Sequence, residues 1–134
     1  MYVHSEGRLY WKWEASPHPE AWEATSGPWG NGVAPPGAYR VVRPAAIAPL
    51  KVNIPYTDKC GFAWFASLEP LFVTDRKSLG LHADGGVPGT RGCIGLKVKD
   101  TRPFFDYLVR EFERSEPVML YVIYPAPSEQ LKAL

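Results

Sequence analysis

A histidine and a cysteine flank a glycine-rich loop in the second half of the sequence, and these residue types suit nucleophilic chemistry. His82 ends an apolar stretch, four of the ten residues at 83–92 are glycine, and Cys93 begins the next apolar stretch. Cysteine attacks as its thiolate, and a histidine within hydrogen-bonding reach supplies the base. Glycine beside a nucleophile gives substrate room and lets backbone amides face a developing oxyanion. The pattern is also typical of a buried thiol beside a structural histidine, so the residues alone leave both interpretations open.

Short β-strands are predicted on both sides of this loop. Runs of apolar, β-branched and aromatic residues, interrupted by 14 Pro and 12 Gly, favour short strands and turns over long helices. The expected strands lie within 1–25 and at 38–42, 61–66, 70–74, 78–82 and 118–124. A loop is expected at 26–37, and the stretch 43–60 shows no clear pattern. A return from strand to loop to strand would bring His82 and Cys93 together.

One helix is predicted after the second strand of this pair. Phe104, Leu108 and Phe112 recur every four residues, Asp100 or Thr101 can cap the start, and Pro117 ends the pattern. Residues 124–134 are expected to form a loose tail. The sequence therefore predicts a single, mainly β domain over 1–134 with one helix packed on it.

Composition limits the classes of function. The chain has 134 residues, a net charge of +1 and no basic run, so nucleic acid is not expected as a partner. No apolar stretch approaches the roughly 20 residues that span a bilayer, so no membrane insertion is expected. The first residues lack a signal-peptide pattern. The oligomeric state cannot be read from these features.

Two motifs resemble the L,D-transpeptidase catalytic-domain family, and they follow each other along the chain in the same order as in that family. His82, its loop and residues 90–94, Thr-Arg-Gly-Cys-Ile, are similar to that family's His, loop and Ser/Thr-x-Gly-Cys followed by an apolar residue. Residues 25–27, Thr-Ser-Gly, and 35–41, Pro-Pro-Gly-Ala-Tyr-Arg-Val, are similar to its upstream Ser-Gly and Pro-x-Gly-x-Tyr/Phe elements. Together they cover roughly 20–110. The short loop also resembles compact members among phage lytic proteins and type VI secretion effectors.

The resemblance implies a β-sandwich-like fold and cysteine-dependent cleavage or exchange of L,D-peptide bonds in peptidoglycan stem peptides, with no cofactor and no metal. It implies that Cys93 is the nucleophile and His82 the base, and that Gly92 with the Cys93 amide forms the oxyanion region. Thr90 would shape the loop and orient His82. The protein would act at the cell wall or periplasm. It would be released by lysis, exported by a dedicated system, or cytoplasmic until then.

Two departures from that family bear on the reaction. The typical transpeptidases carry Arg or Asn two residues after the cysteine, where this chain has Gly95, and the loop between His82 and Cys93 is shorter than usual. A contact that binds the acceptor or stabilises the turn is therefore expected to be missing, which leaves hydrolysis at least as favoured as transpeptidation. Carboxypeptidase, endopeptidase and transpeptidase activity all stay open.

Four further residues are candidates for substrate binding. Arg91 beside the nucleophile suits a substrate carboxylate, which a guanidinium grips in bidentate fashion. Asp84 could orient the imidazole of His82 or bind the amine of the diamino acid. An aspartate before two glycines is also common in ordinary turns. Tyr39 and Arg76 complete the set, with structural roles as their alternatives. Trp64 and Phe65 are expected either to wall a groove or to pack in the core.

Two other classes of protein fit the same residues. A metal-binding domain would use His82, Asp84, Cys93 and His4, although their spacing matches no standard zinc pattern. A non-catalytic wall-binding or structural domain of the same fold would join Cys60 and Cys93 in a disulfide. If the cysteines are free, Cys60 is expected to be a thiol of the core.

Overall fold

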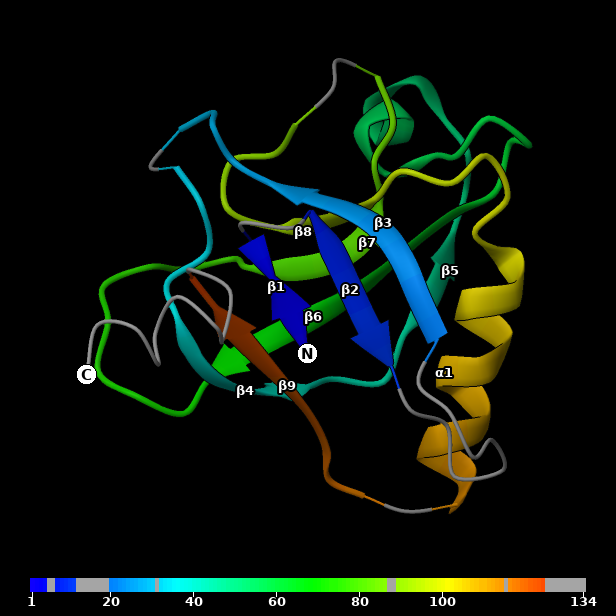
Figure 1. Cartoon of the computed structure of the whole chain (residues 1–134). Helices are drawn as coiled ribbons and strands as arrows, with labels where there is room; N and C mark the ends of the chain where they lie inside the picture. The colour runs from blue at the N-terminus through cyan, green and yellow to red at the C-terminus, as the bar shows by residue number, and fades with distance from the viewer. Residues whose placement is uncertain (5–6, 12–19, 31, 87–88, 115, 125–134) are drawn as a thin grey trace.

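Nine strands, one α-helix and one 3₁₀ helix make up the fold in the computed structural model, which describes residues 1–4, 7–11, 20–30, 32–86, 89–114 and 116–124 (Figure 1). The elements are β1 (Tyr2–Val3), β2 (Arg8–Trp11), β3 (Glu20–Ser26), β4 (Gly37–Val41), β5 (Ala45–Ile47), η2 (Lys51–Tyr56), β6 (Ala63–Pro70), β7 (Gly80–Ala83), β8 (Ile94–Leu96), α1 (Arg102–Arg114) and β9 (Val118–Ile123). The predicted mainly β fold with one helix packed on it is confirmed.

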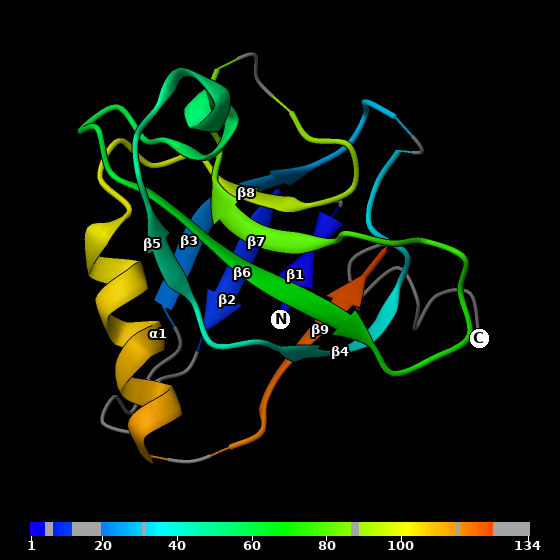
Figure 2. The ribbon, with the colours of Figure 1, turned by 180° about the vertical axis from the view of Figure 1, so that it is seen from behind.

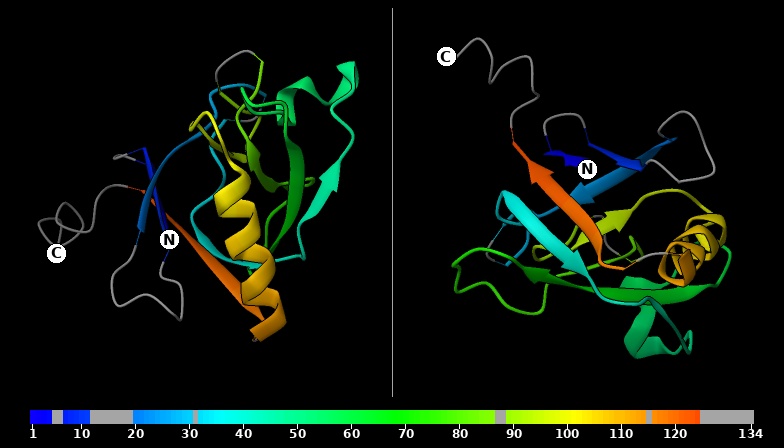
Figure 3. Two further views of the ribbon diagram at one scale, coloured as in Figure 1. Left: turned by 90° about the vertical axis from the view of Figure 1, so that its right-hand side faces the viewer. Right: turned by 90° about the horizontal axis from the view of Figure 1, so that it is seen from below.

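The strands belong to one sheet that curls until it meets itself. Its order is β4-β9-β1-β2-β3-β8-β7-β6-β5, and β4 also pairs with β6. Seen from below, the strands surround the interior and α1 stands at one side (Figure 3). β5 extends the sheet beyond β6 (Figure 2). The layers that face each other across the core are therefore parts of one continuous sheet.

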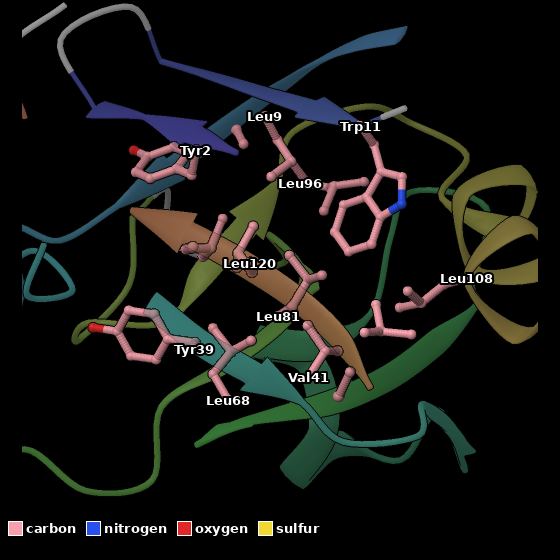
Figure 4. Close-up of a cluster of buried hydrophobic side chains, with 14 of the residues drawn as sticks. Tyr2, Leu9, Trp11, Tyr39, Val41, Leu68, Leu81, Leu96, Leu108 and Leu120 are labelled. Carbon is pink, nitrogen blue, oxygen red and sulfur yellow. The ribbon is translucent and has the colours of Figure 1, made fainter. Parts of the chain in front are cut away.

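The core fills the inside of this curled sheet. Alternation along β9, where Val118, Leu120 and Val122 are buried, directs every second side chain inward. Figure 4 shows Leu120 of β9 in one cluster of buried side chains with Leu108 from α1 and Trp11 from β2. The strands therefore bury the face that carries their apolar side chains.

The helix α1 closes one side of the core with the face that its sequence predicts. Phe104, Leu108 and Phe112 are its buried residues. The Phe104 ring meets the Trp11 ring edge-on, with centroids 5.5 Å apart, and stacks on Trp64 at 5.9 Å. Within the described residues, no helix is long and apolar enough to cross a membrane.

One local prediction differs from the structure, and the structure assigns one stretch that the sequence left open. The strand expected at 70–74 is wrong, because the chain leaves the sheet after Pro70 and the Val73 side chain is fully exposed. The unassigned stretch 43–60 contains β5 and η2. Of the tail expected at 124–134, residues 125–134 lie outside the described residues, and Tyr124 packs against His4 with ring centroids 5.5 Å apart.

A buried carboxylate joins the turn before β6 to the start of α1. Asp58 Oδ1 accepts hydrogen bonds from the amides of Cys60 and Phe62, at 2.9 and 3.0 Å. Its Oδ2 accepts from the Thr101 amide and hydroxyl, at 2.8 and 2.7 Å. Burial alone would raise the pKa of Asp58, but these bonds hold it below its usual value.

Replacing Asp58 with alanine should lower the free energy of unfolding by about 3 kcal/mol, because buried donors lose their acceptor. Urea titration at neutral pH measures the change. The matched control is Asp100→Ala, which removes one exposed acceptor of the Arg102 amide and should cost about 1 kcal/mol. A loss for Asp58→Ala no larger than that of the control would contradict this account of the helix start.

Candidate active site

The pairing of two parallel strands places Cys93 and His82 at one pocket. In the β7–β8 pair, Leu81 is opposite Ile94 and His82 is opposite Gly95 (Figure 2). Cys93 immediately precedes β8, and its side chain and that of His82 line the same pocket. The predicted return from strand to loop to strand therefore brings both residues to one pocket, and within the described residues their hydrogen bonds go to Ser78 and Ala83 rather than to each other.

The His82 ring is held between two aromatic rings in one tautomer. Phe65 stacks on it at a centroid distance of 5.7 Å, and the Tyr56 ring meets it edge-on at 4.8 Å. His82 Nδ1 lies 2.6 Å from the Ala83 carbonyl oxygen. A carbonyl only accepts, so Nδ1 carries the proton and Nε2 keeps its lone pair. Burial lowers the pKa of His82 to about 4, although the bond to Ala83 raises it in part.

The Cys93 thiol is free and half-buried. Its sulfur lies 3.7 Å from the carbonyl oxygen of Ser78, a residue with a φ of 57° in the left-handed region. Burial raises the pKa of Cys93, while a backbone hydrogen bond from Gly80 and the charge of Arg76 lower it in part. Burial therefore favours a neutral thiol at Cys93 and a neutral imidazole at His82.

Both side chains open into one pocket of about 1090 Å³, here called the Cys93 pocket. Residues 29–30, 55–56, 77–79 and 89–91 line it, together with His82, Gly85 and Cys93. Trp29 stands at its rim with 49% of its surface exposed. The site is therefore open to a ligand much larger than water.

Thr90 shapes the loop that carries Cys93. Its hydroxyl donates to the Cys93 carbonyl at 2.5 Å and accepts from the amides of Gly27 and Gly92, at 3.1 and 3.2 Å. The expected loop-shaping role of Thr90 agrees with these contacts, whereas the bond that orients His82 goes to Ala83. Because the Gly92 amide is engaged with Thr90, the Cys93 amide is left as the candidate oxyanion donor.

The upstream motif supports this loop directly. Ser26 Oγ lies 3.3 Å from the Gly92 carbonyl and accepts from the Ala34 amide at 2.9 Å. The Thr90 amide donates to the Gly27 carbonyl at 2.8 Å. The two motifs that the sequence separates by some sixty residues therefore form one hydrogen-bonded unit.

Arg76 ties loops together and does not line the pocket. Its guanidinium donates to the carbonyls of Gly32, Val33 and Arg91, at 3.0, 3.1 and 3.3 Å. A Cβ at Gly92 would lie 2.1 Å from Arg76 Nη2, so only glycine leaves room for this tie. The structure thus gives Arg76 a positioning role in place of the predicted substrate contact.

Arg91 stands where the sequence places it, on the pocket wall. Its side chain is exposed, and its Cβ lies 3.0 Å from the position that a Cβ on Gly30 would take. Among the described residues, no carboxylate forms an ion pair with it. Arg91 is therefore available for an anionic ligand.

Asp84 lies against β8 rather than in the pocket. Its Oδ2 accepts from the Gly89 amide at 3.4 Å, and Oδ1 is buried with no partner among the described residues. Burial raises the pKa of Asp84, and the Gly89 bond and the charge of Lys97 oppose this in part. The predicted contact with the imidazole is wrong, since the carbonyl of Ala83 takes that place.

Gly95 makes room for Asp84. A Cβ at position 95 would lie 2.8 Å from Asp84 Cβ and 3.2 Å from Asp84 Cα. Replacing Gly95 with asparagine, as in the resembling family, should therefore lower the free energy of unfolding by about 1–3 kcal/mol. Urea titration measures it, and the cost should shrink when Asp84→Gly is added. An equal cost with and without Asp84→Gly would exclude this steric explanation.

Tyr39 belongs to the core, so its predicted contact with substrate is wrong. The side chain is completely buried and its hydroxyl donates to the Pro35 carbonyl at 2.5 Å (Figure 4). Burial raises the pKa of Tyr39 to about 12. Trp64 is also a core residue and donates to Thr101 Oγ1 at 2.8 Å, whereas Phe65 supports the site through His82.

The contacts bear on the two competing classes as well. Cys60 and Cys93 are both free, so the disulfide of the binding-domain alternative is absent, and Cys60 is exposed rather than a core thiol. The described residues contain no group of three or more His, Cys, Asp or Glu side chains arranged for a metal ion. His4 instead contacts the Tyr2 hydroxyl through Nδ1 at 3.2 Å.

Sequence reasoning missed the aromatic support of the base. Tyr56 comes from the stretch that has no periodic pattern, and only the fold brings it to His82. Gly80 gave a partial signal: a Cβ there would lie 2.1 Å from Phe65 Cζ, so this glycine allows Phe65 to reach the histidine.

No known protein family matches the chain, and no curated protein sequence or solved structure matches it either. The resemblance to the L,D-transpeptidase family therefore stays a prediction, resting on the two motifs and the geometry around them.

Proposed function

We propose that this protein is a cysteine enzyme that cleaves or exchanges L,D-peptide bonds in peptidoglycan stem peptides. The observation that carries the proposal is one open pocket lined both by the free Cys93 thiol and by the His82 ring, whose tautomer leaves Nε2 unprotonated. The joined motifs around Thr90 and Ser26 support the choice of substrate class, because they are the two elements that carry the resemblance.

The first half-reaction begins from the neutral pair. His82 Nε2 takes the thiol proton as the Cys93 sulfur attacks the carbonyl carbon of the scissile bond. The carbonyl oxygen becomes an oxyanion that accepts from the Cys93 amide. The C–N bond then breaks, the imidazolium gives its proton to the leaving amine, and a thioester to Cys93 remains.

The second half-reaction releases the acyl group. Water, or the amine of a second peptide, gives a proton to His82 while it attacks the thioester carbonyl. The C–S bond breaks and the thiol recovers its proton from the imidazolium. Gly95 offers no side chain to hold an acceptor amine, which favours water.

A product assay tests the proposal. The protein is incubated with muropeptides that carry tetrapeptide stems, with and without an added D-amino acid, and the products are identified by mass. Loss of the terminal D-residue indicates hydrolysis, and incorporation of the added D-amino acid indicates exchange. No product from the wild-type protein in either mixture would overturn the proposal. Its site of action, the cell wall or periplasm, follows from the substrate.

A further inference from the structure

The Cys93 pocket is lined by two cations and, among its described lining residues, by no carboxylate. The cations are Lys77 and Arg91, and both are exposed. The ion pairs formed by the described residues use other side chains, so neither charge is neutralised by a neighbour. A pocket with this lining attracts anions.

The two cations reach the pocket from different segments, and each segment touches the nucleophile. Lys77 precedes Ser78, whose carbonyl oxygen lies 3.7 Å from the Cys93 sulfur. Arg91 is two residues before Cys93, and the hydrogen bond from Arg76 to its carbonyl fixes its backbone. An anionic group bound by these side chains would therefore lie near the reacting carbonyl.

Asp84, the acidic residue of the loop between His82 and Cys93, does not form an ion pair with either cation. The carboxyl of Asp84 lies over Gly95 and accepts from the Gly89 amide, and it does not line the pocket. The cationic character of the pocket is therefore retained.

We propose, resting on the function proposed above, that Lys77 and Arg91 select acyl donors by a free carboxylate next to the scissile bond. In an uncross-linked stem peptide this group is the carboxylate of the terminal D-residue, which the planar guanidinium of Arg91 suits as a bidentate partner. Lys77 adds a second positive charge from the segment that leads to Ser78. A stem whose terminal carboxyl is amidated, or joined to another stem, lacks this group and is the poorer donor.

A binding experiment tests the selection apart from catalysis. The full chain carrying Cys93→Ala is titrated calorimetrically with a stem tetrapeptide and with the same peptide as its C-terminal amide. The free acid is expected to bind about tenfold more tightly than the amide. Raising the salt concentration should weaken binding of the acid more than binding of the amide, because exposed charges are screened.

Variants identify the residues responsible. Lys77→Gln with Arg91→Gln, added to Cys93→Ala, should make the acid and the amide bind equally. Arg8→Gln with Lys99→Gln removes two exposed cations outside the pocket lining and should keep the tenfold preference. Equal binding of acid and amide by Cys93→Ala, or no binding of either, would overturn the selection. The product assay with wild-type protein judges the proposed reaction separately.

Discussion

Cys93→Ala is expected to reduce kcat/KM for stem-tetrapeptide cleavage by a factor on the order of 10⁴ or more, because no acyl-enzyme can form without the sulfur. The fold should be retained, since the thiol is half-buried and lies at a pocket rather than in the core. Initial rates from separated products give kcat/KM, and far-ultraviolet circular dichroism checks the fold.

The second cysteine provides the matched control. Cys60 is exposed in the turn held by Asp58, outside the pocket lining. Cys60→Ala should therefore cleave the peptide at the wild-type rate. A Cys93→Ala protein that is folded and cleaves as fast as Cys60→Ala would exclude Cys93 as the nucleophile.

His82→Gln is expected to lower kcat/KM by about 10²–10⁴, the usual contribution of a general base. The glutamine removes the unprotonated Nε2 and keeps a side chain between Phe65 and Tyr56. Because burial lowers the pKa of His82 to about 4, wild-type activity should fall as the pH drops through about 4. A histidine with an ordinary pKa would make activity fall near pH 6.5 instead. The pH profile of kcat/KM measures this.

The same histidine makes stability depend on pH. Its pKa is about 4 in the folded protein and 6.5 when unfolded, so the unfolded chain binds more protons between these values. The wild-type free energy of unfolding should therefore fall by up to about 3 kcal/mol relative to His82→Gln as pH drops from 7 to 4. Asp84, with its raised pKa, acts in the opposite direction in both proteins.

His4→Gln is the control for both measurements, since His4 contacts Tyr2 and Tyr124 and lies outside the pocket lining. It should keep the wild-type kcat/KM. Full activity of His82→Gln across the pH range would show that another group takes the thiol proton.

Patterns that repeat along the chain were predictable from the sequence. The fourfold spacing of Phe104, Leu108 and Phe112 gave the buried face of α1 correctly, because a helix places these positions on one side. The run at 70–74 has the same apolar character as a strand, yet it leaves the sheet. The pairing of β6 with β4 ends at Pro70, and the exposed side chain of Val73 shows that the apolar run beyond it is not buried.

The site was predictable to the extent that its residues are close in the chain. His82 and Cys93 border one loop, and the parallel pairing of β7 and β8 brings them to one pocket. Tyr39 was misassigned because a motif does not tell which face of a strand is buried. Tyr56 comes from an irregular segment and was not predicted as part of the site, since nothing local links it to His82.

The central claim is a thioester between Cys93 and the stem peptide, and trapping it is the most direct test. Wild-type protein is mixed with tetrapeptide substrate, quenched in acid within the first turnover, digested and analysed by mass. The account predicts an adduct on the peptide that contains Cys93, equal to the substrate minus its terminal D-residue, and none on Cys60. Turnover with no adduct on Cys93, or with the adduct on Cys60, would contradict it.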